Sequence, residues 1–256
     1  MPSYIVTTHD KPTGRKLAMT PTVVKQWAID NKIPFFDPAK LDAEFTEQLK
    51  KCESEVFIVA SYGKIIPEAI VNMPSHGSLN IHPSLLPKYR GPSPLPTSIL
   101  DDVKNTGVTI IKMDKEMDHG PIIAQKEITI NEWPNYADFE ENMAKEGAKL
   151  LAEVLPKWIA GEIKERVQDH SSATFTKKII KEDGLIDLKA DPYVNFRKIQ
   201  AYSEWPQAYF FINKSGKQLR VKITSASYKA GALIIEKVIP EGSKEMSYKD
   251  FSIGYL

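Results

Sequence analysis

Three polar side chains at expected strand ends could together carry out acyl chemistry. Asn80 and His82 are two residues apart on an expected strand at 79–82, so they share one face. Asp118 lies in the turn after the next expected strand, at 108–113. Asn80 and His82 can donate hydrogen bonds to a carbonyl oxygen that becomes negative, and Asp118 can orient the imidazole or accept a proton. This set is typical of acyl transfer to an amine.

The end of the strand places these groups where ligands usually bind. Pro83 ends the strand at His82, because proline lacks an amide donor and has a fixed φ. In an open α/β sheet, the carboxyl ends of the strands border the ligand crevice. We therefore expect Asn80, His82 and Asp118 to share one crevice at the carboxyl edge of a mainly parallel sheet.

A simpler interpretation exists for each residue taken alone. A histidine on a strand is more often structural than catalytic, and acidic residues near glycine usually only solvate a turn. The combination of Asn80 and His82 at a strand end, a proline-rich apolar loop and Asp118 favours a functional interpretation. No nucleophilic Ser or Cys motif and no metal-ligand spacing is present, so no metal is expected. His9, His76 and His170 lack such a setting, and no role is expected for them.

Strands and helices alternate around these residues, which predicts an α/β fold: a Rossmann-like, mainly parallel sheet with helices on both faces. Strands are expected at 4–6, 33–36, 56–60, 79–82, 108–113 and 122–130, and helices at 20–31, 41–50, 67–72, 94–100 and 136–160. We expect Thr20 to cap the first helix and 56–60 to be a fully buried strand. The segment 7–20 is rich in turn formers and charge, which predicts an exposed loop.

A second, smaller domain is expected at the C-terminal end. Periodicity fades near 162–174, so we assign residues 1–165 to the catalytic domain, 166–174 to a linker and 175–256 to the small domain. That domain should hold a helix at 191–201 and antiparallel strands at 209–212, 219–228 and 233–239. It is basic: from Ser171 onward, 14 Lys and Arg stand against 9 Asp and Glu, a net charge of +5.

Composition excludes several classes of protein. The 256 residues are 42% hydrophobic and 26% charged, and no apolar run approaches the length of a membrane span. Cys52 is the single cysteine, and nothing at the N-terminus is typical of a signal peptide. A net charge of +1 argues against a dedicated nucleic-acid binder. We expect a soluble, cytoplasmic, monomeric protein.

Several motifs together resemble one family. They are the run from Asn80 to Pro92 (NIHPSLLPKYRGP), the run from Thr106 to Asp114 (TGVTIIKMD) and the run from Asp118 to Pro121 (DHGP). These resemble the formyltransferases that use 10-formyltetrahydrofolate. The resemblance implies that Asn80, His82 and Asp118 form the catalytic trio and that the formyl donor is 10-formyltetrahydrofolate.

Further stretches resemble the members of that family whose acceptor is initiator methionyl-tRNA. These are the loop residues 10–16 with 19–21, and the segments 176–179, 181–184 and 205–206, which resemble the start of an OB-like β-barrel domain. The resemblance implies tRNA contacts by Arg15 and Lys16. It also implies a folate site, made by Ser84, Leu85, Leu86, Pro87, Tyr62, Gly63, Ile65, Ile66, Met113 and Asp114.

Other functions remain open at this point. One is formyl transfer to a different amine, on a purine-pathway ribonucleotide or a sugar. Another is a non-catalytic, truncated relic that binds tRNA or folate. Members of the family begin with a strand and helix ahead of the segment that matches 4–8, and their β domain has about one more hairpin. We therefore expect a shortened chain or a misassigned start, with an unpaired strand edge or apolar groove where that unit belongs.

Overall fold

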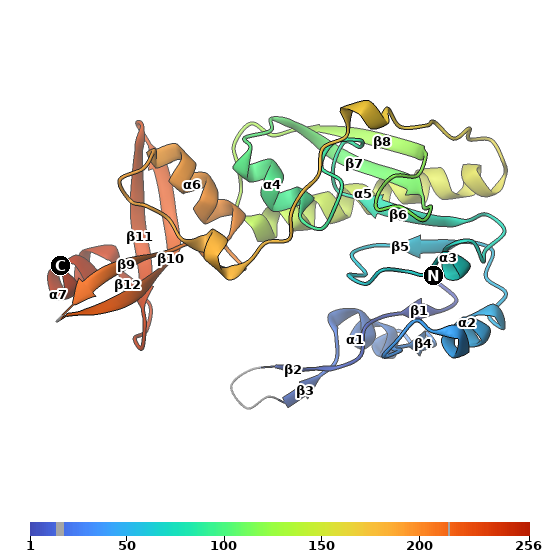
Figure 1. The fold of residues 1–256 in the computed structure, drawn as a ribbon, viewed down its shortest axis with the longest axis horizontal. Coiled ribbons are helices and arrows are strands. Elements are labelled where there is room, and N and C mark those ends of the chain that lie inside the picture. The colour runs from blue at the N-terminus through green and yellow to red at the C-terminus, as the bar shows by residue number, and fades with distance from the viewer. Residues whose placement is uncertain (14–17, 215) are drawn as a thin grey trace. The chain divides into compact units, whose positions relative to one another are not determined.

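The computed structural model describes residues 1–13, 18–214 and 216–256, which divide into two compact units. Figure 1 labels their helices and strands. The first unit comprises Met1–Ile81 and Lys112–Glu116, and the second comprises His82–Ile111 and Met117–Leu256. The predicted domains, 1–165 and 175–256 with a linker at 166–174, stay a prediction.

The first unit combines two small parallel pairings with short helices. β1 pairs in parallel with β4, and β5 pairs in parallel with the start of β6. The elements are β1 (Ile5–Val6), β2 (Lys11–Thr13), β3 (Ala18–Thr20), α1 (Val23–Asp30), β4 (Phe35–Phe36), α2 (Ala43–Lys50), β5 (Phe57–Val59), α3 (Glu68–Val71) and β6 (Ser78–His82). Their shared core is built around Phe45, Leu49 and Ile70. The predicted strand and helix order is confirmed here.

Two local predictions in this unit are wrong. The helix cap is Thr22, whose hydroxyl accepts a hydrogen bond from the amide of Lys25 at 3.1 Å, and not Thr20. Thr20 instead pairs with Lys11 in the β2–β3 hairpin, so the segment 7–20 is not simply a loop. Arg15 and Lys16, which are predicted to contact tRNA, lie outside the described residues.

The strand expected to be fully buried is partly open to solvent. Ile58 in β5 is 39% exposed. Within the described part of the first unit, β5 pairs only with β6, and β1 only with β4. β1 and β5 thus each have one described pairing partner. The unpaired edge expected at the place of a preceding strand and helix stays a prediction. A continuous apolar run indicates a strand suited to burial, but burial also needs a neighbour on each side.

The second unit begins with the end of β6 and holds an antiparallel pair. β7 (Asn105–Lys112) pairs with β8 (Ile122–Thr129), and α4 (Pro94–Leu100) precedes them. The long helix α5 (Tyr136–Ile159) follows, with its cap at Asn135. Its buried residues recur at helical spacing, at Phe139, Met143, Gly147, Leu150 and Val154. One apolar stripe thus fixes α5 to the rest of its unit, as its sequence pattern predicts.

The C-terminal part is a four-stranded antiparallel sheet in the order β12-β11-β10-β9. Its elements, after the short helices η1 (His170–Ser172) and η2 (Lys181–Gly184), are α6 (Pro192–Ala201), β9 (Tyr209–Lys214), β10 (Lys217–Lys229), β11 (Ala232–Pro240), β12 (Met246–Ser247) and α7 (Tyr248–Tyr255). The small β domain is thus confirmed. Its described strands pair as an open sheet. The sequence interpretation missed α7, although Ser247 caps it and Phe251 is fully buried.

Helix α6 fastens the β domain to α4 within the second unit. Arg197 donates to the carbonyl oxygen of Leu100 at 2.5 Å, and the Tyr193 hydroxyl donates to Asp102 Oδ1 at 2.9 Å. Burial by itself raises the pKa of Asp102. Hydrogen bonds from Lys104, Trp133 and Tyr193 outweigh burial and lower that pKa below its usual value. Asp102 is therefore a charged anchor for the C-terminal domain.

Candidate active site

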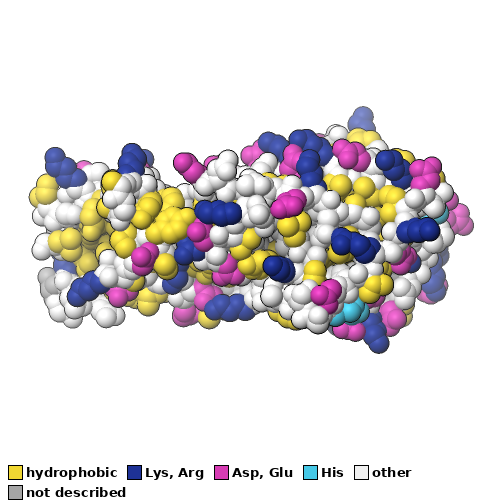
Figure 2. All heavy atoms as spheres, turned by 90° about the horizontal axis from the view of Figure 1, so that it is seen from above, with side chains coloured by type: hydrophobic (Ala, Val, Ile, Leu, Met, Phe, Trp, Pro, Cys, Tyr) yellow, Lys and Arg dark blue, Asp and Glu magenta, His cyan; other side chains and the backbone are white. Residues whose placement is uncertain are grey.

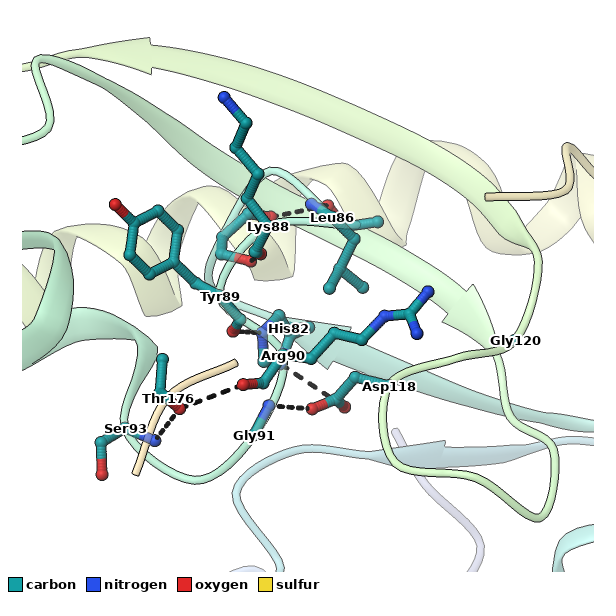
Figure 3. A network of polar contacts seen from close by, with 12 residues as sticks. His82, Leu86, Lys88, Tyr89, Arg90, Gly91, Ser93, Asp118, Gly120 and Thr176 are labelled. Atoms are coloured by element: carbon teal, nitrogen blue, oxygen red, sulfur yellow. Dashed lines mark hydrogen bonds and ion pairs between the residues drawn. The ribbon is translucent and has the colours of Figure 1, made fainter. Parts of the chain in front are cut away.

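His82 ends β6, and its two ring nitrogens have different surroundings. Nε2 lies 2.8 Å from the carbonyl oxygen of Tyr89. A carbonyl only accepts, so Nε2 must carry a proton and donate. His82 as a whole is 4% exposed. Its Nδ1 faces Asp118, with 3.6 Å between Nδ1 and Asp118 Oδ1 (Figure 3). Nδ1 is therefore the nitrogen left for proton transfer.

Asp118 is held by the loop that follows His82. The amide of Gly91 donates to Asp118 Oδ2 at 2.8 Å, which leaves Oδ1 on the side of His82 (Figure 3). Asp118 has a left-handed backbone, with φ of 50°, which few residues other than glycine, Asn and Asp adopt. The structure thus brings together two members of the predicted trio, His82 and Asp118.

Gly91 is required by both backbone conformation and space. Its φ is +108°, and a Cβ there would lie 3.0 Å from the carbonyl oxygen and from the hydroxyl of Thr176. Thr176 in turn donates to the carbonyl oxygen of Arg90 and accepts from the amide of Ser93. A side chain at Gly91 would push this segment away and move the amide that holds Asp118.

The loop after His82 is fixed by its own polar groups. The Ser84 hydroxyl is fully buried and donates to the carbonyl oxygen of Lys88 at 2.7 Å. Thr109 of β7 donates to the carbonyl oxygen of Ser84 at 2.6 Å and accepts from the amide of Leu86 at 3.1 Å. Leu86 packs with Ile111 and Ile122. Ser84 and Leu86 thus have structural contacts of their own.

Leu85 packs closely on β7 at a glycine. A Cβ at Gly107 would lie 2.6 Å from Leu85 Cδ2 and 2.1 Å from the carbonyl oxygen of Lys126. The absence of a side chain at Gly107 therefore lets the loop sit against the strand. Leu85 and Pro87 remain half-buried, so part of each side chain faces solvent.

The segment expected to be a linker runs along this loop. Arg90 and Phe175 form a parallel β-bridge, and the amide of Arg90 donates to the carbonyl oxygen of Thr174 at 2.9 Å. Gln168 and His170 of the same segment bind the Arg90 guanidinium. No role was expected for His170, and Gln168 was missed. A single buried glutamine in a polar stretch gives no periodic signal, so only the structure identifies it.

The predicted site residues of the first unit lie as follows. Asn80 is half-buried on β6, opposite Val59 of β5. The Tyr62 side chain is part-buried, and burial raises the pKa of its hydroxyl. Gly63 is exposed, and Ile65 is 90% exposed. Ile66 packs on the core around Phe45.

The last two predicted folate residues follow β7. The amide of Met113 donates to the carbonyl oxygen of Ser78 at 2.8 Å, and Asp114 Oδ1 accepts from the amide of Glu116 at 2.9 Å.

Across the described ranges, no three His, Cys, Asp or Glu side chains gather as they do around a metal. No described helix is long and apolar enough to cross a membrane.

Family models match both parts of the chain. Residues 3–155 match the model described as "Formyl transferase", and residues 178–231 match "Formyl transferase, C-terminal domain". The chain is 39% identical over 229 residues to the methionyl-tRNA formyltransferase of Sulfurihydrogenibium sp., covering 88% of this chain and 74% of that protein. It is 43% identical over 218 residues to the enzyme of that name from Chloroflexus aggregans, covering 85% and 70%.

Solved structures share the fold. The methionyl-tRNA formyltransferase from Clostridium thermocellum matches with a TM-score of 0.64 and 20% identity, over 93% of this chain and 97% of that one. HypX from Aquifex aeolicus, in complex with tetrahydrofolic acid, matches with a TM-score of 0.69 and 16% identity; this chain spans 47% of its length. These likenesses confirm the predicted fold class, an α/β catalytic part with a small β domain. The chain belongs to the formyl transferase family.

Proposed function

We propose that the protein transfers the formyl group of 10-formyltetrahydrofolate to the amino group of initiator methionyl-tRNA. The observation that carries this assignment is the relation to methionyl-tRNA formyltransferases, at 39% and 43% identity over more than four-fifths of the chain. It extends over the catalytic part and into the C-terminal domain. The product would serve translation initiation, and the proposed location is the cytoplasm.

The His82 and Asp118 pair supports a mechanism of attack on the formyl carbon. The amine nitrogen forms the new C–N bond while the formyl oxygen becomes an oxyanion. Asn80 donates a hydrogen bond to that oxygen, a contact worth roughly 10² to 10³ in rate. The proton lost by the attacking nitrogen passes to Asp118 or to Nδ1 of His82. It then returns to the folate nitrogen as its bond to carbon breaks, which releases tetrahydrofolate.

The fixed roles of the two His82 nitrogens fit this proton path. Nε2 already donates to the carbonyl oxygen of Tyr89 and holds the ring in place. The 3.6 Å between Nδ1 and Asp118 Oδ1 exceeds a direct hydrogen bond. The gap is too narrow for a water or a nitrogen atom, but a proton that enters it can be bound by either atom. We propose that this pair takes up the proton of the attacking amine.

The folate site keeps the predicted residues, with different contributions. Ser84 and Leu86 are buried and use their own contacts, so they shape the loop. Leu85 and Pro87 are half-buried and Ile65 is largely exposed, so each has surface to give to a bound ring. Tyr62, Gly63, Ile66, Met113 and Asp114 would supply backbone groups around the pterin.

The β2–β3 hairpin is proposed as the arm that reaches the tRNA. In the sequence, Arg15 and Lys16 stand between its two strands, outside the described residues. Lys25 fixes the base of the hairpin, with Nζ 2.7 Å from Asp10 Oδ1 and 2.7 Å from Asp37 Oδ2. An anchored hairpin with two cationic residues between its strands in the sequence suits contacts to phosphates or base edges of an acceptor stem.

The C-terminal domain is proposed to add contacts that do not depend on sequence. Its Lys and Arg side chains appear as separate groups among hydrophobic ones on the face that Figure 2 shows. Arg220 and Lys222 lie two apart on β10 and border a hollow of about 180 Å³. Spaced cations bind a phosphate backbone without reading bases.

We propose that the protein acts as a monomer.

A panel of acceptors tests the proposed function. The full chain is given 10-formyltetrahydrofolate with methionyl-tRNA, free methionine, an amino sugar nucleotide or a purine-pathway ribonucleotide amine. We expect formylation of methionyl-tRNA alone. Transfer to a small amine with none to methionyl-tRNA would overturn the assignment. Binding of tRNA or folate with no transfer to any acceptor would favour a non-catalytic role.

A further inference from the structure

The Arg90 guanidinium is a buried cation whose described partners are neutral. Its side chain is 4% exposed. Nε and Nη2 donate to Gln168 Oε1 at 3.3 and 2.7 Å, and Nη2 also donates to His170 Nδ1 at 2.9 Å. The guanidinium lies 5.9 Å from the centre of the Phe175 ring. A buried charge needs such partners, so these contacts hold Gln168 firmly.

The nitrogen of the Gln168 amide binds the turn that contains Asp118. Nε2 donates to the carbonyl oxygen of Asp118 at 2.9 Å and to that of Gly120 at 2.7 Å. A guanidinium only donates, so the oxygen of the amide must face Arg90 and its nitrogen must face the turn. Arg90 thereby sets the orientation of Gln168, and Gln168 binds the two carbonyls on either side of His119.

The turn needs such support, because Asp118 has a φ of 50°. Residues with a side chain seldom adopt this conformation, and contacts from the surroundings help to hold it. The amide of Gly91 fixes the carboxylate of Asp118. Gln168 fixes the backbone, and the two contacts together set where Oδ1 points.

We propose that Gln168, oriented by Arg90, is a positioning residue that holds Asp118 in register with His82. This inference rests on the proposed catalytic role of Asp118. The competing interpretation is that Gln168 only provides a buried partner for Arg90 and stabilises the segment 168–176. Both interpretations require the Arg90 contact, but only the proposal requires the two bonds to the turn.

Gln168→Glu separates the two interpretations. A carboxylate accepts from Arg90 at least as well as an amide, but it has no N–H to donate and would repel both carbonyl oxygens. We expect kcat for methionyl-tRNA formylation to fall about 10²-fold, as for other small misplacements of a catalytic group, with KM for the folate unchanged. Gln200→Ala is the matched control, because Gln200 also donates to a backbone carbonyl, that of Trp133. Its kcat should match the wild type.

A double-mutant cycle gives a readout that a structural role would not move. In an Asp118→Asn background, Gln168→Glu should cost little further rate, because the group that it positions is already disabled. Gln168→Met, which removes both ends of the amide, serves if Gln168→Glu does not fold. Each rate is measured well below the variant's melting temperature. Wild-type kcat in the Gln168 variant, or full additivity in the cycle, would overturn the proposal. A wild-type chain with no formyl transfer would instead contradict the proposed function and, with it, this role.

Discussion

One carboxylate oxygen of Asp118 lies 3.6 Å from Nδ1 of His82, facing the one ring nitrogen that is not used by the backbone. The pair is preorganised, because Gly91 fixes the other oxygen of Asp118 and Tyr89 fixes the other nitrogen of His82. Neither contact requires a bound substrate. The backbone already holds both side chains in place, so the proposed role of Asp118 is to accept a proton.

Asp118→Asn should abolish most activity without disturbing the fold. The Asn oxygen can still accept from the amide of Gly91, but an amide cannot take up a proton. We expect kcat for formyl transfer to fall by about 10² to 10⁴, the usual contribution of general-base assistance. Steady-state kinetics with methionyl-tRNA, together with folate affinity by calorimetry, measure this.

The matched control for that variant is Asp187→Asn, a turn aspartate outside the proposed site that accepts a bond from the amide of Lys189. An amide oxygen preserves this bond, so kcat should stay close to the wild-type value. If Asp118→Asn kept full activity, Asp118 would be only a structural member of the turn.

Arg15→Ala should weaken formylation of methionyl-tRNA strongly while folate binding stays intact. The reason is that Arg15 is proposed to contact the tRNA and not the folate. Rates at subsaturating tRNA and folate affinity, measured on the same preparations, decide this. Lys51→Ala, an exposed lysine just after α2, is the control. Equal losses of folate affinity and tRNA formylation would mean that the arm merely supports the fold.

The C-terminal domain should contribute binding that fades as salt rises. Each phosphate contact releases counterions, so Arg220→Ala and Lys222→Ala should each lower the slope of log affinity against log salt by about 1. Lys157→Ala, an exposed lysine near the end of α5, should leave the slope unchanged. Titrations of tRNA binding across salt concentrations measure the slopes. Unchanged slopes in both domain variants would exclude these side chains from the phosphate contacts.

Glu146 should make stability depend on acid pH. Hydrogen bonds from Lys126 and then Lys149 lower its pKa from 4.5 to about 2. A folded-state pKa below the unfolded one adds stability above the unfolded pKa, and this stability is lost as pH falls toward the folded pKa. Glu146→Gln should therefore lower Tm near neutral pH, and the difference from wild type should shrink below about pH 4.5.

Thermal unfolding followed at several pH values measures this difference. Glu132→Gln removes an exposed glutamate from the loop before α5 and is the control, with no change in Tm expected. A Glu146→Gln difference that stayed constant across the acid range would show that the ion pair contributes nothing to stability, as many surface pairs do.

Sequence patterns located the elements well and the contacts poorly. Pro94 and Pro192 predict helix starts, and the structure confirms both. Proline is favoured in the first turn of a helix, because the amide that it lacks would have no partner within the helix there. His82 and Asp118 could be paired, since His82 ends one strand and Asp118 lies in the turn after another. Gln168 could not, because its role depends on a segment some 50 residues from Asp118 in the chain.

Exposure was harder to predict than secondary structure. The apolar run of β5 reads as a buried strand, yet Ile58 is 39% exposed because burial depends on neighbouring strands. Helix α1 shows apolar spacing, but of its residues only Ala28 is buried. Local patterns state what a segment prefers, and tertiary packing decides whether that preference is met.

The central claim is that His82 is a catalytic residue for formyl transfer to methionyl-tRNA. The single-turnover rate of that transfer tests this claim most directly. The full chain, saturated with 10-formyltetrahydrofolate, is mixed with methionyl-tRNA as wild type, as His82→Ala and as the control His76→Ala. We predict formylmethionyl-tRNA from wild type and His76→Ala at equal rates, and a rate lower by about 10² to 10⁴ from His82→Ala, with its folate affinity retained. Equal rates from wild type and His82→Ala would contradict the account.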